Sequence, residues 1–173
     1  MALILYDIAS FYKKFLIDVN YKVSCSNGNQ YMIIGNPENF LHLTGLQDAV
    51  PNLDPIDFYY DCINNKYTDV RTLIPSSTDK CLKNKILIKA NYFYNIQNCI
   101  LLKGNLYICN NIIAFCNDFS VGNKTKTHTV LFIYSKQLNA YVPLSNQIDK
   151  NSSYSWVNQK HYSFTPIDSI EII

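Results

Sequence analysis

Residues 106–144 read LYICNNIIAFCNDFSVGNKTKTHTVLFIYSKQLNAYVPL. Four short runs in this stretch are rich in β-branched and aromatic residues: LYIC (106–109), IIAFC (112–116), HTVLFIY (128–134) and AYVPL (140–144). Gly, Asn and Lys residues separate the runs, which is typical of strands joined by turns. A fifth run, HYSF (161–164), follows later in the chain. The stretch therefore predicts an antiparallel sheet of four or more strands.

The residues that precede this stretch have the pattern of a helix followed by a hairpin. Apolar side chains recur at helical spacing over residues 3–18, which predicts an amphipathic helix docked on the core. Asn27-Gly28 separates the β-rich runs YKVSC (21–25) and QYMII (30–34). Asn-Gly between such runs is a strong hairpin signal, because both residues tolerate positive φ. We therefore expect a hairpin directly after the first helix.

Three more helices are indicated by their start signals. Asn36-Pro37 and Asp54-Pro55 each pair an N-cap residue with proline at the first helical position. Ser77-Thr78-Asp79 offers cap residues for a segment whose apolar residues fit one helical face to about residue 102. The expected helices therefore span roughly 37–43, 55–65 and 80–102.

Helices followed by strands predict the α+β fold class. We expect a single domain over residues 1–173, with the N-terminal helices and the hairpin packed against the C-terminal antiparallel sheet. Residues 146–153 are mostly polar, and they are the one segment expected to form a flexible insertion.

The composition supports a folded protein and leaves the partner open. The chain has 173 residues, of which 48% are hydrophobic and 16% are charged, so disorder is excluded as its main state. Its net charge of +2 neither indicates nor excludes a polyanionic partner. Nucleic-acid binding depends on a local basic patch rather than on the total charge.

Several classes of protein are excluded by missing motifs. The six Cys form no CxxC pair, so the pattern of a zinc ribbon or of a thioredoxin-like site is absent. GxGxxG, GxxxxGK and HExxH are absent as well, which argues against dinucleotide enzymes, P-loop NTPases and zincins. The first residues lack the pattern of a signal peptide, and no run is long enough for a membrane helix. We therefore expect a cytoplasmic protein with reduced thiols, no membrane association, no metal and no cofactor.

Acid–base chemistry would have to begin with the three histidines, because only their unperturbed pKa lies near neutrality. His42 lies in FLHLTGL (40–46), near the end of a short helix that Gly45 stops. One interpretation is a histidine that caps a helix end, and the other is a catalytic group. His128 follows Lys124 and Lys126 at a period of two, so the three share one strand face. This edge would either bind a phosphate or form a solvated hairpin tip.

Polar side chains lie at every second position of the last predicted strand. His161, Ser163 and Thr165 share one face of that strand, which is either solvent-exposed or the floor of a cleft. The lysines at 80, 83, 85 and 89 do not form one helical stripe, which favours a solvated surface for this cluster.

A family resemblance follows from the order of these segments. NFLHLTGL (39–46) comes after the hairpin, and VLFIY (130–134), YVPL (141–144) and SFTPIDSIEII (163–173) come after a helical middle. Together they resemble the phage-associated branch of the barnase, EndoU, colicin and RelE-like (BECR) nuclease families. The resemblance implies helices packed on a four-stranded antiparallel sheet, and a metal-independent ribonuclease. Such enzymes activate the ribose 2′-hydroxyl for attack on the adjacent phosphate and leave a 2′,3′-cyclic phosphate.

The resemblance also suggests a set of site residues. His42 and Thr44 occupy the positions that match the family motif. The spacing of polar residues along the predicted strands and helix adds further candidates. These are His128 or His161 as the partner acid, Lys126 or Lys89 as the cation, and Ser163 or Thr165 as hydrogen-bond donors. The implied partners are RNA, with tRNA as one candidate, and an antitoxin or immunity protein if the chain is a toxin or phage-defence effector.

Two alternatives to a ribonuclease are considered. The first is a catalytically inactive module of a mobile element that binds a protein or a nucleic acid with exposed Tyr and Lys side chains, and it predicts a salt-sensitive complex without turnover. The second is a nucleotidyl or ADP-ribosyl transferase, for which the sequence has no marker of a dinucleotide pocket.

Overall fold

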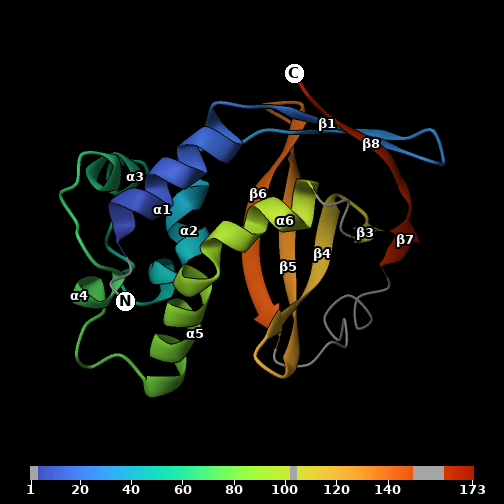
Figure 1. Ribbon diagram of the computed structural model, residues 1–173. Helices are drawn as coiled ribbons and strands as arrows, with labels where there is room; N and C mark the ends of the chain where they lie inside the picture. The colour runs from blue at the N-terminus through green and yellow to red at the C-terminus, as the bar shows by residue number, and fades with distance from the viewer. Residues whose placement is uncertain (1–3, 102–104, 150–161) are drawn as a thin grey trace.

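A computed structural model describes residues 4–101, 105–149 and 162–173 of the chain. Helices make up the first part of the fold and strands the second, apart from one early hairpin (Figure 1). The α-helices are α1 (Leu5–Tyr12), α2 (Asn39–Thr44), α3 (Pro55–Ile63), α4 (Val70–Leu73), α5 (Lys80–Asn91) and α6 (Ile96–Leu101). Short helical turns extend them: the π-helical turn η1 (Lys13–Ile17) and the 3-10 turns η2 (Leu46–Asp48) and η3 (Phe93–Asn95).

All the described strands belong to one sheet. They are β1 (Tyr21–Cys25), β2 (Gln30–Ile33), β3 (Asn105–Cys109), β4 (Ile112–Val121), β5 (Lys124–Ser135), β6 (Ala140–Asp149), β7 (Ser163–Thr165) and β8 (Ile167–Ile172). Their order in the sheet is β7-β3-β4-β5-β6-β2-β1-β8. Every pairing is antiparallel except that of β2 with β6, where Ile33 lies opposite Tyr141.

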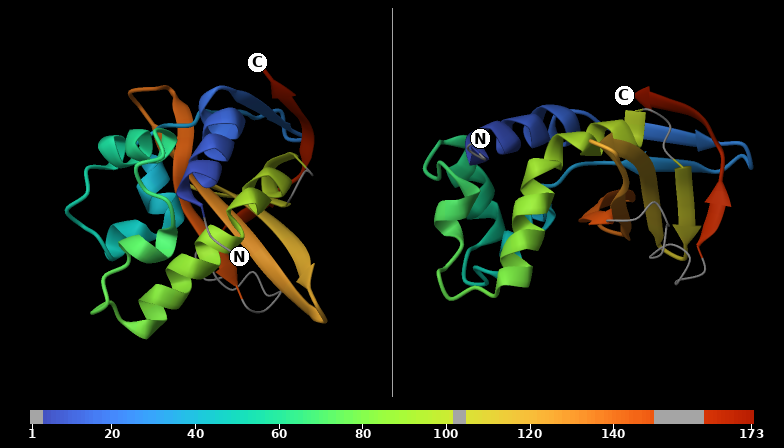
Figure 2. Two further views of the ribbon diagram at one scale, coloured as in Figure 1. Left: turned by 60° about the vertical axis from the view of Figure 1, so that its left-hand side comes forward. Right: turned by 60° about the horizontal axis from the view of Figure 1, so that its bottom comes forward.

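The last described segment nearly closes this sheet on itself. β7 pairs with β3 at one end of the sheet and β8 pairs with β1 at the other, although only Pro166 separates the two strands. Proline has no N–H to donate to a strand ladder, so it is suited to the point where the chain changes partner. Figure 2 shows the strands curving away from the helices, which stay together on one side of β5 and β6.

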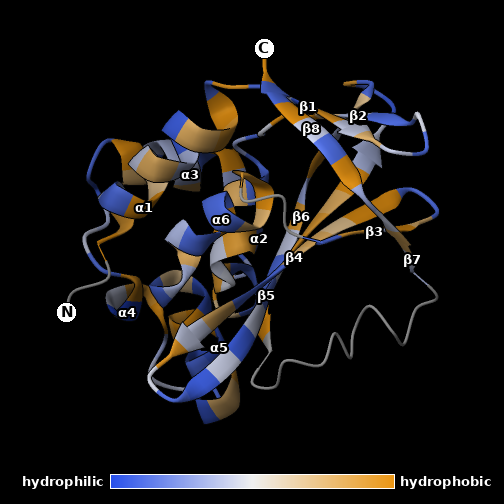
Figure 3. Ribbon diagram, turned by 45° about the vertical axis from the view of Figure 1, so that its right-hand side comes forward, coloured by the Kyte–Doolittle hydropathy of each residue, from blue (hydrophilic) through white to orange (hydrophobic). Residues whose placement is uncertain are grey.

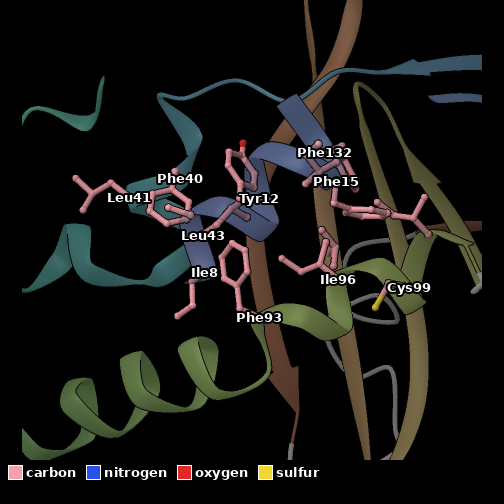
Figure 4. Packing of buried hydrophobic residues seen from close by; sticks show 14 of the residues in the cluster. Ile8, Tyr12, Phe15, Phe40, Leu41, Leu43, Phe93, Ile96, Cys99 and Phe132 are labelled. Atoms are coloured by element: carbon pink, nitrogen blue, oxygen red, sulfur yellow. The ribbon is translucent and has the colours of Figure 1, made fainter. Parts of the chain in front are cut away.

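The core lies between these helices and one face of the sheet. Tyr12 of α1, Phe40 of α2 and Phe93 of η3 meet there, with ring centroids 5.3 Å apart for Tyr12 and Phe40 and 5.8 Å apart for Phe40 and Phe93 (Figure 4). Phe115 and Phe132 continue the cluster on the sheet at 5.7 Å. All five side chains are fully buried, and burial of a side chain of this size contributes about 1.5–3 kcal/mol. The helical layer is therefore anchored on β4, β5 and β6.

Hydropathy changes along β5. Figure 3 shows the half of this strand nearest the β4–β5 turn as hydrophilic and the other half as hydrophobic. The first half holds Lys124, Lys126 and His128, and the second half holds VLFIY (130–134). The polar end of the sheet therefore lies on the side of α5 (Figure 3).

The structure confirms the α+β class and corrects the layout. The hairpin forms, but its strands extend the sheet instead of packing against it, because β2 pairs with β6 and the Ile34 N–H donates to the Tyr141 carbonyl at 3.0 Å. The helix expected over roughly 80–102 is divided, because the 3-10 turn η3 separates α5 from α6.

The expectation of a flexible insertion at residues 146–153 is wrong for its first part. Residues 146–149 continue β6, and Asn146 is fully buried with hydrogen bonds from both ends of its amide. Residues 150–153 lie outside the described part of the chain.

Candidate active site

A pocket of about 520 Å³ lies between α5 and the end of β6. We call it the α5–β6 pocket, and its lining residues are Asp48, Cys81, Asn84, Lys85, Ile88, Lys89, Gln147 and Ile148. The start of α5 is fixed by Asp79, whose carboxylate accepts from the backbone N–H groups of Cys81 and Leu82 at 2.9 and 3.0 Å. The helix then runs past the carboxyl end of β6 (Figure 1).

Lys89 is positioned in the pocket by the glycine that ends α2. Gly45 has φ +79°, the left-handed conformation that terminates a helix. A Cβ on this residue would lie 2.9 Å from Cδ of Lys89, so the missing side chain makes room for the lysine stem. Lys89 is partly buried, and it is one of the residues that line the pocket.

The ammonium of Lys89 has no fixed counterion. Its Nζ makes no hydrogen bond or ion pair with any residue that the structure describes. Burial lowers the pKa of Lys89, while Asp48 acts in the opposite direction and Lys85 adds to the lowering. A partly desolvated cation without a partner gains from binding an anion. The pocket is therefore suited to a phosphate group.

His42 lies in the last turn of α2, which ends at Gly45 beside the stem of Lys89, and it is not among the residues that line the pocket. Its ring is partly exposed, and Nδ1 lies 2.8 Å from Oε1 of Gln47 in η2, the residue before Asp48. Because an amide oxygen only accepts, Nδ1 carries the proton of the neutral ring and Nε2 keeps a free lone pair. His42 therefore has a nitrogen that can accept a proton.

Thr44 is placed differently from its neighbour in the motif. It is fully buried, its Oγ1 donates to the Leu41 carbonyl at 2.7 Å, and the same oxygen accepts from the Leu46 N–H at 3.4 Å. Both contacts lie within the end of α2. This geometry favours a structural role for Thr44.

His128 is fully buried on the helix-facing side of β5. Its Nδ1 accepts from Nδ2 of Asn95 at 3.2 Å, and its Nε2 donates to Oδ1 of Asn146. Burial lowers the pKa of His128 to about 4, so the ring is neutral at pH 7. The interpretation of residues 124–128 as a solvated tip is wrong for His128, although Lys124 is exposed. The placement favours a structural role over proton transfer with RNA.

The buried neutral state of His128 predicts an acid-sensitive fold. The pKa of about 4 lies below the ordinary value of 6.5, so the unfolded chain binds a proton more readily than the folded one. This contribution to stability is complete above about pH 6.5 and is lost as the pH falls to about 4. Between pH 7 and pH 4, the free energy of unfolding should fall by about 3 kcal/mol more in the wild type than in His128→Gln. Urea titrations at both pH values measure the difference, and equal losses would contradict the assignment.

The remaining predicted site residues do not gather at this pocket. Lys126 donates from Nζ to the Tyr92 hydroxyl at 3.3 Å, and Nζ lies 4.8 Å from the centroid of that ring. Ser163 is exposed and Thr165 is buried, and both belong to β7, which is four strands away from β6 in the sheet. His161 lies outside the described residues.

A second group of polar side chains lies on the other face of β4 and β5. Thr127 donates from Oγ1 to Oδ1 of Asp118 at 2.6 Å, and Oγ1 of Thr129 lies 3.4 Å from Sγ of Cys116. Both threonines are buried, and each hydroxyl has a partner. These contacts satisfy buried polar groups, as strand interiors require.

The sequence patterns did not point to Asp48, Asn84 or Gln147 as lining residues of the α5–β6 pocket, and they assigned Lys85 to a solvated surface. Lys85 and Lys89 stand four residues apart and therefore share a face of α5, a signal that is visible once the cluster is examined pair by pair. Gln147 fell in the segment expected to be flexible. The described residues contain no group of three or more His, Cys, Asp or Glu that could hold a metal ion. In the described part of the chain, the helices are too short or too polar to cross a membrane.

The fold and the pocket together define a class of protein. Helices cover one face of a nearly closed sheet, and an unpaired cation lies beside that sheet, as expected for an α+β protein that acts on an anionic ligand. The family model described as phage-Barnase-EndoU-ColicinE5/D-RelE like nuclease4 matches residues 4–170, so the chain belongs to this nuclease family. No curated protein and no solved structure matches the chain.

Proposed function

We propose that the protein is a metal-independent endoribonuclease that cleaves RNA by attack of the ribose 2′-hydroxyl, with the scissile phosphate in the α5–β6 pocket. The observation that carries this proposal is Lys89, which lines the α5–β6 pocket with Lys85 and Asp48 and whose ammonium has no hydrogen-bond or ion-pair partner among the described residues. His42 belongs to α2, the helix that ends at Gly45 beside the stem of Lys89. Membership of a nuclease family supports nucleic acid as the substrate.

The reaction needs a base, an acid and positive charge. The base takes the 2′-hydroxyl proton, the 2′-oxygen attacks phosphorus, and the acid protonates the leaving 5′-oxygen. Donors and cations that face the phosphorane stabilise its charge, and this electrostatic effect is often the largest single contribution to catalysis.

The residues at the pocket can be assigned to these roles. His42 Nε2 is free to act as the base, because Nδ1 is engaged with Gln47. Lys89 is suited to give a proton to the 5′-oxygen, since burial destabilises its charged form. Lys85 is then the cation that stabilises the negative charge of the phosphorane. Two ammonium groups in one pocket support a reaction that needs no divalent cation.

These roles differ from those suggested by the sequence pattern, in which His128 or His161 is the acid and Lys126 or Lys89 is the cation. His128 has both ring nitrogens engaged in the interior, so the acid is assigned to Lys89 in its place. A biological role as a toxin or phage-defence effector, held in check by an antitoxin or immunity protein, is part of this proposal and is supported by the phage association of the family.

The decisive experiment examines the cleaved ends. Purified protein should cut labelled RNA in the presence of a chelator, and the upstream product should end in a 2′,3′-cyclic phosphate. An RNA with one 2′-deoxyribose at the cleavage site should resist cutting there, because it lacks the nucleophile. Cleavage that requires an added divalent cation, or that proceeds equally well on the 2′-deoxy substrate, would overturn the proposal. Salt-sensitive binding without cleavage would favour the inactive binding module.

A further inference from the structure

A chain of hydrogen bonds, partly buried at Asn95 and buried from His128 onward, joins four elements. It runs from Asn95 in η3 to His128 in β5, then to Asn146 in β6, and ends on the Leu43 carbonyl in α2. His128 and Asn146 are fully buried. Asn146 and Leu43 stand 103 residues apart in the sequence, so the last link fixes the packing of a helix on a distant strand.

The direction of each bond in this chain is determined by the one before it. Oδ1 of Asn95 accepts from Asn98 Nδ2 at 2.7 Å, which turns Asn95 Nδ2 toward His128. Nδ1 of His128 must then accept, so Nε2 carries the ring proton and donates to Oδ1 of Asn146. Nδ2 of Asn146 is left to donate to Leu43 at 3.4 Å. One tautomer of His128 therefore sets the orientation of the Asn146 amide.

The hydrogen-bond chain ends on α2, the helix that carries His42 and whose terminal Gly45 packs against the stem of Lys89. Carbonyls in the last turn of a helix have no helical partner and need another donor. Leu43 follows His42 directly and stands two residues before Gly45, on which the stem of Lys89 packs. A shift of this helix end relative to β6 would displace His42 and Lys89 together.

We propose that His128 is a positioning residue of the active site: through Asn146 it holds the carboxyl end of α2 against β6. The residue touches neither substrate nor reacting atoms in this arrangement. The inference rests on the proposed function for its kinetic consequence, whereas its structural consequence can be measured without any substrate.

Two substitutions separate positioning from proton transfer. His128→Gln keeps an N–H donor toward Asn146 but cannot titrate, whereas His128→Phe keeps the ring volume and removes both polar atoms. We expect His128→Gln to retain kcat within about threefold with an unchanged pH profile. We expect His128→Phe to lower kcat by about 10–100-fold with little change in KM, because small displacements of catalytic groups are costly. Asn146→Asp, which cannot donate to Leu43, should resemble the Phe variant and serves as the second test if that variant does not fold.

The matched control is Thr129→Val, which removes a buried hydroxyl from the other face of the same strand. It should leave kcat unchanged. An NMR measurement on the protein without RNA supplies the independent readout. The backbone amide signals of Gly45 and Asp48 should shift in His128→Phe and in Asn146→Asp, and they should stay in place in Thr129→Val. The imidazole nitrogens of His128 should show a proton on Nε2 alone.

The outcomes distinguish this inference from the proposed function. If the wild type does not cleave RNA but the amide signals move as described, the proposed function fails and the positioning of α2 by His128 stands. If those signals stay in place in both His128→Phe and Asn146→Asp, the inference is overturned. Loss of activity in His128→Gln with unmoved signals would also overturn it, because that result would assign proton transfer to His128.

Discussion

Replacement of Lys89 by methionine is expected to lower kcat/KM for RNA by about 10²–10³-fold, the loss typical of removing one preorganised charged group or donor from a transition state. The same substitution should leave the folded protein as stable as the wild type, or more stable. Burial already disfavours the charged form of Lys89, and the thioether of methionine carries no charge to desolvate. Methionine also keeps an unbranched stem to pack on Gly45. Activity is therefore expected to fall without any loss of stability.

The matched control for this prediction is Lys83→Met. Lys83 is exposed on the same helix and does not line the α5–β6 pocket. Its substitution removes the same charge from the molecule, so it corrects for the general weakening of RNA binding. Cleavage rates and urea titrations of both variants give the comparison. Equal losses of activity in Lys83→Met and Lys89→Met would show that the lysines act only through the total charge.

The local pairings of the fold could be predicted from the sequence. β3, β4, β5 and β6 pair with their neighbours along the chain, so strand runs and intervening turns were sufficient to predict them. The parallel pairing of β2 with β6 and the pairing of β1 with β8 join segments that are far apart. Such pairings depend on which edges are left free after the core has packed, and no local pattern encodes them.

Asn146 shows, for a single side chain, that local sequence does not predict contacts with distant segments. A polar run between strands is typical of a loop, so the sequence predicts a flexible insertion there. In the structure its amide has a buried histidine on one side and a helix carbonyl on the other. A buried polar group is tolerated when it is hydrogen-bonded, and the existence of these partners is decided by tertiary packing. The pattern identified Asn146 as polar, and it could not identify those partners.

The sequence predicts only part of the candidate site, because the rest depends on contacts between distant segments. His42 and Lys89 were both named from the sequence, the first by the family motif and the second as one of two cations. The structure relates them through Gly45, which ends the helix that carries His42 and receives the stem of Lys89 from α5. Asp48 and Gln147 come from segments without a recognisable motif. A residue that is functional only through its neighbours in space carries no signal in its own segment.

His42→Ala is expected to lower kcat for RNA cleavage by about 10²–10⁴-fold, the usual contribution of a general base. The ring is the only described imidazole with a free nitrogen, because both nitrogens of His128 are engaged in the interior. The loss should appear in kcat more than in KM, since His42 is neutral when it acts as the base and adds no charge to substrate binding. Cleavage of a single-site RNA under saturating and subsaturating conditions separates the two constants.

The stability of His42→Ala makes this loss interpretable. His42 is partly exposed and makes one side-chain hydrogen bond, so its removal should cost no more than about 1 kcal/mol of unfolding free energy. Gln47→Ala removes the same hydrogen bond and leaves the imidazole, and it is expected to reduce kcat by less than about tenfold, since it affects only the orientation of the ring. If Gln47→Ala were as damaging as His42→Ala, the contact between the two side chains would matter more than the proton on the ring. If His42→Ala cleaved within tenfold of the wild type, the base would have to be another group, and Asp48 is the pocket residue that could replace it.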